Sequence, residues 1–154
     1  MTRPADTSPR PPRAAASPRG RAASRWVLAA LYLAAGVTHL ALPAPFLLIT
    51  PGWVPAPAAV ILGTGLCEIA GALALPTRRL RRLAGMALAL YAVCVVPANI
   101  KQAMGGLPGG DMLLGWWYHA PRLALQPVLV WWALFAGEVV DWPFRPRRAP
   151  PDAC

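Results

Sequence analysis

The chain has 154 residues, of which 56% are hydrophobic and only 14% are charged, and its formal net charge is +9. The length fits one domain, and the long apolar runs are typical of a membrane protein rather than of a soluble core. The basic residues lie in the terminal segments and in one loop, with no basic face that alternates with stacking aromatics, so no nucleic-acid partner is expected.

Residues 1–24 consist largely of Arg, Pro, Ala and Ser, which predicts a disordered basic tail. The apolar run that follows, residues 26–42, is just long enough to span a membrane. A secretory signal peptide is the alternative interpretation, because basic residues precede this run. The run exceeds the usual apolar region of about 7–15 residues, and no convincing cleavage site follows it, so we favour a retained first helix.

The connection over residues 43–57 contains five prolines and no basic residue. Proline disfavours a continuous helix, while the remaining side chains are mostly apolar. This connection is therefore predicted to be a loop in the outer interface of the bilayer, anchored by Trp53.

The second predicted helix, residues 56–75, is apolar except for Glu68 near its middle. An ionised side chain at the centre of a spanning helix costs roughly 2.5–3.5 kcal/mol, whereas each Leu, Ile or Val contributes only about 0.3–0.6 kcal/mol in return. The seven such residues of this helix roughly cancel the cost of Glu68 and do little more. We expect Glu68 to be protonated or to meet polar side chains from neighbouring helices.

Two further helices are predicted at residues 83–104 and 122–140, after a basic turn at residues 77–82. Pro97 is expected to kink the first of these two helices. Residues 142–154 are polar, Pro-rich and basic, and predict a second disordered tail. The predicted fold is an all-α, four-transmembrane-helix bundle over residues 25–141.

Basic residues outside the predicted helices alternate between the two sides of the membrane. Six precede the first helix, none lies in the first connection, four lie in the basic turn, only Lys101 belongs to the third connection, and three follow the last helix. Lys and Arg accumulate on the cytoplasmic side of membrane proteins, so both termini and the basic turn are predicted to be cytoplasmic.

Every predicted helix carries a polar side chain in the outer half of the bilayer or near its middle, as judged from a rise of about 1.5 Å per residue. The five candidate site residues are His39, Glu68, Asn99, Arg122 and Gln126. Ionisable residues within a membrane are candidates for function, and the other four are the polar neighbours that Glu68 requires. The alternative interpretation is a satisfied polar network that only fixes helix packing, with Arg122 reaching the interface by itself.

Other features of the sequence point to packing rather than chemistry. Gly63, Cys67 and Gly71 repeat every four residues and predict a ridge that lets another helix approach closely. His119 lies beside interfacial aromatics and is expected to be exposed. His39 and Glu68 offer two metal ligands, fewer than a metal site requires, and the three cysteines form no CxxC pair, so no metal is expected.

Several short segments resemble the DoxX family of small bacterial four-helix membrane proteins. They are AGVTHL (35–40), ITPGWVPAP (49–57), GLCEIAGALAL (65–75), VPANIKQAM (96–104) and PRLALQP (121–127), so the resemblance covers roughly residues 26–140. It implies a plasma-membrane four-helix bundle in which the five candidate residues are family-type polar positions. Related four-helix thiol-redox proteins carry a reactive cysteine pair, which this chain lacks.

The resemblance implies an association with quinone-linked membrane oxidation. The leading hypothesis is an accessory or binding subunit of a membrane redox system, with a redox partner protein in the bilayer and a quinone-like ligand between the helices. Two alternatives are a proton or small-solute transporter and a structural or assembly scaffold. No catalytic residue is assigned.

Overall fold

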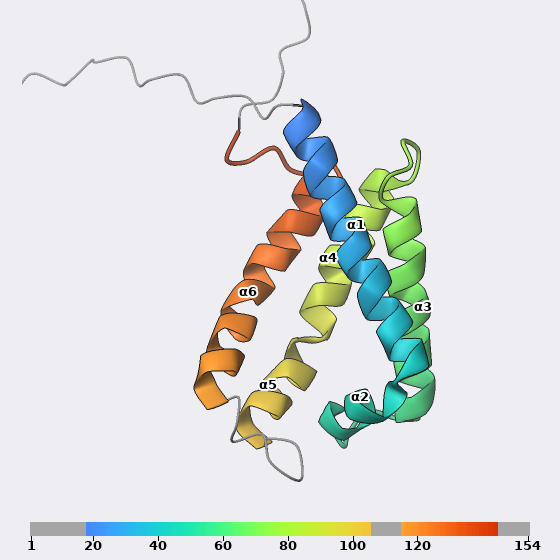
Figure 1. Cartoon of the computed structure of the whole chain (residues 1–154), viewed down its shortest axis with the longest axis vertical. Coiled ribbons are helices and arrows are strands. Elements are labelled where there is room, and N and C mark those ends of the chain that lie inside the picture. Colours follow the sequence, from blue (N-terminus) through green and yellow to red (C-terminus); the bar gives the residue numbers. More distant parts are fainter. Residues whose placement is uncertain (1–17, 106–114, 145–154) are drawn as a thin grey trace, which may run out of the picture.

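The computed structural model describes residues 18–105 and 115–144, in which helices are joined by turns and there is no β-strand (Figure 1). Pro18, Pro43 and Pro57 each begin a helix, consistent with the tolerance of the first helical turn for proline. The helices are α1 (Pro18–Ala41), α2 (Pro43–Ile49), α3 (Pro57–Ala74), α4 (Arg81–Cys94), α5 (Val96–Gly105) and α6 (Gly115–Ala136).

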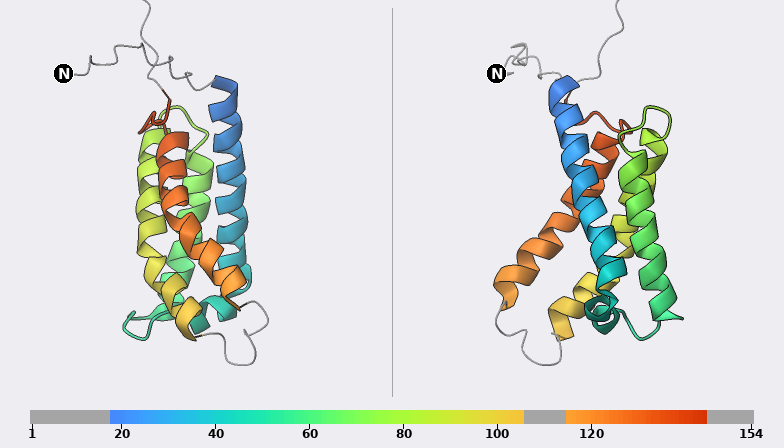
Figure 2. Two further views of the ribbon diagram at one scale, coloured as in Figure 1. Left: turned by 90° about the vertical axis from the view of Figure 1, so that its left-hand side faces the viewer. Right: turned by 45° about the vertical axis from the view of Figure 1, so that its right-hand side comes forward.

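The long helices run alternately up and down and form two packed pairs. α1 lies along α3, and α4 lies along α6 (Figures 1 and 2). The start of α1, the turn between α3 and α4, and the chain after α6 share one end of the molecule, called here the terminal end. α2 and α5 lie at the opposite end, called here the α2 end, where α1 and α6 diverge.

Two helical segments are long and apolar enough to cross a membrane: Pro57–Ala74 and Arg81–Met104, the second of which combines α4 and α5. A third is added if α1 and α2, which meet at a bend of 92°, are counted as one span. α6 has a comparable length of 22 residues, but its prolines and polar side chains lower its hydropathy. The structure thus confirms an all-helical protein with two or three potential membrane spans.

The predicted helix boundaries agree with the structure to different extents. α3 ends within one residue of the predicted 56–75 at both ends. The predicted helix 83–104 is divided at Val95 into α4 and α5, because Pro97 has no N–H to bond back to the carbonyl of Val93. α6 begins seven residues before the predicted 122–140 and ends four residues before its predicted end.

α1 begins at Pro18, so residues 18–24 are helical and not part of a disordered tail as predicted. Two arginines in the first part of α1 bind the end of α6 and the chain that follows it. Arg21 forms an ion pair with Asp141 (2.6 Å), and Arg25 pairs with Glu138 (2.7 Å) while its Nε donates to the carbonyl of Ala136 (2.9 Å). The predicted tails over residues 1–17 and 145–154 lie outside the described residues.

The connection over residues 43–57 is not a loop throughout, because α2 occupies its first half. Its two prolines lie in the first turn, where a missing N–H costs no helical hydrogen bond. The chain turns at Leu42 and α2 then lies across the end of the bundle (Figure 1). Trp53, predicted as an interfacial anchor, is 74% exposed.

The predicted ridge of Gly63, Cys67 and Gly71 allows close helix approach only at Gly71, where an added Cβ atom would lie 2.5 Å from Leu88 Cδ2 of α4. A Cβ atom on Gly36 of α1 would lie 2.7 Å from the carbonyl oxygen of Gly65 in α3. By contrast, Gly63 has no neighbour within 4 Å of such an atom, and Cys67 is exposed. The face of α3 that packs on α1 therefore carries Gly65, and the predicted ridge is confirmed at Gly71, against α4, but not at Gly63 or Cys67.

The apolar core fills the terminal half of the molecule. Leu28 of α1, Leu75 directly after α3, and Leu88 of α4 are its largest fully buried side chains. Alanines such as Ala133 and Ala136 on α6 complete this core and allow close helix packing. The α2 half is less tightly filled, and the cavity described next lies there.

Candidate functional site

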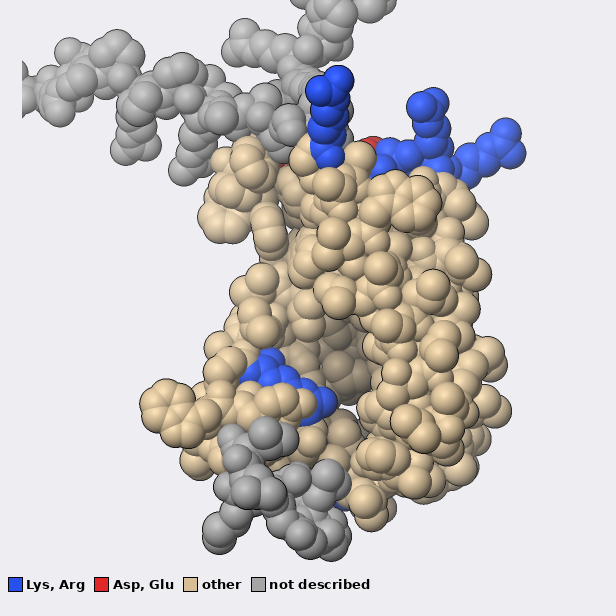
Figure 3. All heavy atoms as spheres, in the orientation of Figure 1, with Lys and Arg blue, Asp and Glu red and all other residues tan. Residues whose placement is uncertain are grey.

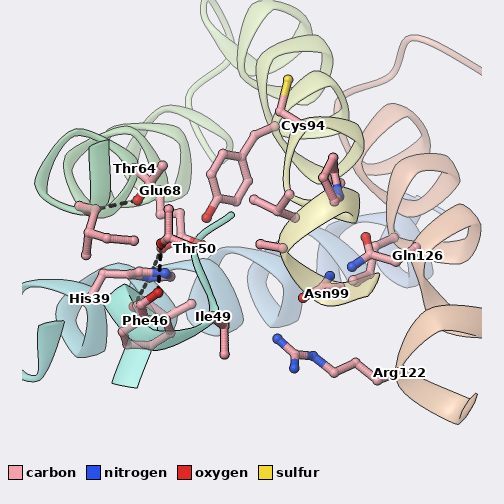
Figure 4. Close-up of a pocket in the computed structure, with 18 of the residues that line it drawn as sticks. His39, Phe46, Ile49, Thr50, Thr64, Glu68, Cys94, Asn99, Arg122 and Gln126 are labelled. Carbon is pink, nitrogen blue, oxygen red and sulfur yellow. Dashed lines mark hydrogen bonds and ion pairs between the residues drawn. The ribbon is translucent and has the colours of Figure 1, made fainter. Parts of the chain in front are cut away.

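A cavity of about 800 Å³ lies between the α1–α3 pair and the α5–α6 pair, with α2 at its end. Figure 3 shows a hollow on the face between α1 and α6, with a cationic side chain at its rim. All five residues singled out from the sequence line this cavity: His39, Glu68, Asn99, Arg122 and Gln126. They occupy two facing walls (Figure 4). That these residues bind a ligand remains a prediction.

His39 and Glu68 form the α1–α3 wall of the cavity. His39 Nδ1 lies 2.8 Å from Glu68 Oε2 and 3.0 Å from the carbonyl oxygen of Ala35. Nδ1 carries a single hydrogen, so these two acceptors compete for it. The Glu68 side chain is only 4% exposed, and it meets one of the polar partners that its depth in an apolar helix required.

Aromatic rings fix the positions of this pair. The Phe46 ring of α2 stacks on the His39 imidazole, with 3.8 Å between ring centroids. On the other side, the Tyr91 phenol of α4 interacts with the Glu68 carboxylate. Tyr32 packs edge-on against Tyr91 and donates a long hydrogen bond of 3.4 Å to the carbonyl of Leu88. Helices α1, α2, α3 and α4 therefore all contribute to holding this wall.

The α5–α6 wall carries Asn99, Gln126 and Arg122 (Figure 4). Asn99 and Gln126 are buried, at 7% and 8% exposure. Arg122, one turn before Gln126, donates a hydrogen bond to Gln102 Oε1, and its guanidinium lies 5.9 Å from the centroid of the Tyr118 ring. Arg122 is therefore held by neighbours on α5 and α6, and not by Glu68 across the cavity.

Three residues that support the site were not singled out from the sequence. Gln102 lies three residues after Asn99 on the same helical face, so the i, i+3 spacing would have found it. Lys101 donates to the carbonyl oxygens of Leu48 and Thr50 at the end of α2. Phe46 gave no sequence signal, because its contact with His39 depends on the bend between α1 and α2.

Two buried acceptor oxygens of the cavity have no hydrogen-bond donor among the described residues: Glu68 Oε2 and Gln126 Oε1. The contact of Glu68 Oε2 with His39 Nδ1 is short but is not aligned as a hydrogen bond. Such atoms call for a donor from water or from a ligand, because a buried acceptor without one is costly.

Within residues 18–105 and 115–144 there is no group of three or more His, Cys, Asp or Glu residues that could hold a metal ion. His119, which was expected to be exposed, is buried at 6% exposure and packs edge-on against Tyr118 outside the cavity lining. An apolar cavity with a His–Glu pair on one wall and amide and guanidinium groups on the other can bind a small apolar molecule that carries polar substituents.

Comparison with known proteins identifies a family but no characterised relative. No curated protein and no solved structure matches the chain. Residues 28–137 match a family model described as a domain of unknown function, DUF8561. The match covers α2 to α6 entirely and more than half of α1, and therefore includes all five cavity residues singled out above. Because it spans well over half of the sequence, the chain belongs to the DUF8561 family.

Proposed function

We propose that this protein is a DoxX-like, multi-pass plasma-membrane protein that binds a small apolar, quinone-like molecule in its cavity, as an accessory subunit of a membrane redox system. In this proposal α1, α3, the α4–α5 pair and α6 are four membrane spans. Both termini lie in the cytoplasm, and the cavity opens in the outer half of the bilayer.

The distribution of exposed side chains supports a membrane location. Large apolar side chains are exposed along the length of every long helix, as lipid contact requires. Examples outside the cavity lining are Val37 (50%), Leu62 (55%), Leu73 (62%), Leu90 (65%) and Val128 (45%). Figure 3 shows an uncharged surface over most of this face, with basic side chains grouped at the terminal end.

The basic residues of the terminal end support the proposed orientation. Arg78 and Arg79 lie in the turn between α3 and α4, at the same end of the molecule as the start of α1, which carries Arg19 and Arg21 (Figure 1). Clusters of this kind mark the cytoplasmic side, where they also contact anionic lipid headgroups. At the α2 end the described cations are Lys101, which binds backbone carbonyls, and Arg122.

The observation that carries the proposal is the cavity itself. Its volume of about 800 Å³ lies within the range of about 300–1,000 Å³ for small-molecule sites, and its lining is mostly apolar. The hollow opens sideways between α1 and α6 (Figure 3), toward lipid in the proposed orientation. A molecule dissolved in the bilayer could therefore enter without crossing water.

The packing of the terminal half favours binding over transport. Leu28, Leu75 and Leu88 fill the bundle between the cavity and the terminal end. Beyond them, Glu138 is held by Arg25 and Arg81 at 2.7 and 2.5 Å. A cavity closed in this way is a pocket and not a continuous path.

The proposal is tested with decylubiquinone and its reduced form as probes of the full chain in lipid nanodiscs. Trp53 and Trp117 line the cavity, so quenching of tryptophan fluorescence reports occupancy. We expect saturable binding beyond that seen with empty nanodiscs, weakened about tenfold or more by Arg122→Gln and unchanged by the matched variant Arg79→Gln in the exposed turn. If neither probe binds saturably to the folded protein, a quinone-like ligand is ruled out.

A further inference from the structure

The two acceptor oxygens without donors indicate what kind of ligand the cavity takes. Glu68 Oε2 and Gln126 Oε1 both belong to side chains that are more than nine-tenths buried, at 3% and 8% residue exposure. Both side chains line the cavity, from opposite walls. When Glu68 is ionised and paired with His39, its carboxylate and the Gln126 amide oxygen can only accept hydrogen bonds, and they select for a ligand that donates one.

The neighbouring hydroxyl groups of the cavity do not supply a donor to Glu68 Oε2, although the Tyr91 phenol interacts with the Glu68 carboxylate. The Thr64 hydroxyl donates to the carbonyl of Ile61 (2.8 Å), and the Thr50 hydroxyl donates to the carbonyl of Phe46 (2.8 Å). The single hydrogen of His39 Nδ1 has the carbonyl of Ala35 as its aligned acceptor. Glu68 Oε2 therefore has the His39 imidazole 2.8 Å away but no aligned donor, and a molecule in the cavity can supply one.

We propose that the ligand carries a hydroxyl group that donates a hydrogen bond to Glu68 Oε2, so that it is a lipophilic phenol or hydroquinone. This inference rests on the proposed function, which makes the cavity a site for an apolar molecule. A ligand that offers only carbonyl or ether oxygens displaces water from Glu68 and leaves the carboxylate without a donor, which lowers its affinity. A hydroquinone has a second hydroxyl, for which Gln126 Oε1 is an acceptor on the other wall.

The rest of the cavity fits the body of such a molecule. Leu31 on α1, Ile61 on α3 and Leu125 on α6 contribute apolar lining between the two polar walls. An aromatic ring with an alkyl chain gains affinity from this surface whether or not it carries a hydroxyl group. The hydroxyl therefore decides the preference between two otherwise matched ligands.

The experiment compares 4-hexylphenol with its methyl ether, 4-hexylanisole, for binding to the full chain in lipid nanodiscs. Tryptophan quenching by decylubiquinol, with each compound as competitor, gives both affinities after subtraction of partitioning into empty nanodiscs. Because the hydroxyl meets a carboxylate, we expect the phenol to bind about tenfold to a hundredfold more tightly than the ether. Equal affinities, or tighter binding of the ether, overturn the inference while leaving an apolar ligand site intact. If neither compound nor decylubiquinol binds, the proposed function fails instead.

Two matched variants locate the hydroxyl contact. Glu68→Gln removes the negative charge and keeps the shape, so the preference for the phenol should fall several-fold. Glu138→Gln makes the same chemical change at the terminal end and should leave the preference unchanged. A preference that is retained in folded Glu68→Gln assigns the contact to another group and overturns the inference. If Glu68→Gln does not fold, the relative affinities of the wild type for the phenol and the ether still test the inference.

Discussion

Small differences in residue position decide how α1 and α3 pack. Gly63 and Gly65 are two residues apart, which places them on nearly opposite sides of α3. A Cβ atom on Gly36 would meet the Gly65 carbonyl oxygen at 2.7 Å and Ile69 Cγ1 at 2.8 Å, and the first of these is backbone that cannot rotate away. A methyl group there must push the two helices apart.

We therefore predict that Gly36→Ala lowers the free energy of unfolding by about 1–3 kcal/mol. Gly63→Ala is the matched control, because nothing lies within 4 Å of its added methyl group and alanine favours helix by about 0.5–1 kcal/mol. In thermal unfolding in detergent, followed by circular dichroism, the melting temperature should fall for Gly36→Ala and rise for Gly63→Ala. Equal melting temperatures would show that the helices are not in close contact at Gly36.

Glu138 sits just after α6 and joins three segments of the terminal end. Burial alone would raise its pKa, but hydrogen bonds and charges from Arg81 and Arg25 outweigh burial and hold the pKa below its usual value of 4.5. A carboxyl group with a lowered pKa stabilises the fold above its unfolded-state pKa and loses that contribution as pH falls through its folded-state pKa.

The melting temperature of the wild type should consequently fall between about pH 5 and pH 3, and Glu138→Gln should show a shallower fall over that range. At neutral pH the variant should be the less stable protein, because Arg25 and Arg81 lose their charged partner. The two melting temperatures should converge at the acid end, where Glu138 is protonated in the wild type. Parallel curves over the whole range would show that the ion pairs do not stabilise the fold.

At the scale of helices, α2 is the least anchored element of the structure. It has seven residues, none of which is buried. Besides packing on α3, it makes two specific contacts: the Phe46 ring stacks on His39, and Lys101 donates to the Leu48 and Thr50 carbonyls at its C-terminal end. A cation at this position also interacts favourably with the helix dipole.

Lys101→Met should therefore loosen α2 without unfolding the bundle. We expect faster amide hydrogen exchange in residues 43–50, equivalent to a loss of about 1 kcal/mol of local stability, while the melting temperature stays nearly constant. Lys101→Arg keeps the charge and should show exchange close to the wild type. Unchanged exchange in Lys101→Met would show that Phe46 alone holds the helix.

At the scale of the whole molecule, the sequence predicts the long helices well because each is set by a continuous apolar run. α3 is bounded by Pro57 and Pro76, and both limits could be read from the sequence. The common cavity of the five polar residues also follows from helix rise and alternating direction. The bend at Leu42, the face of α3 that packs on α1 and the ion pairs of Arg25 could not be predicted, because each depends on how helices are rotated and tilted in three dimensions.

The proposed topology makes a prediction about the two ends of the bundle. In a variant with Cys67, Cys94 and Cys154 replaced by serine, a single cysteine is introduced either as Gly52→Cys at the α2 end or as Arg79→Cys at the terminal end. Nothing lies within 4 Å of a side-chain atom added at Gly52, and Arg79 is exposed, so neither change should disturb packing.

With both termini cytoplasmic, a membrane-impermeant maleimide should label Gly52→Cys in right-side-out vesicles and Arg79→Cys only in inverted vesicles. Labelling of both from one side would contradict a membrane-spanning bundle, and the reversed pattern would place the cavity in the cytoplasmic half of the bilayer.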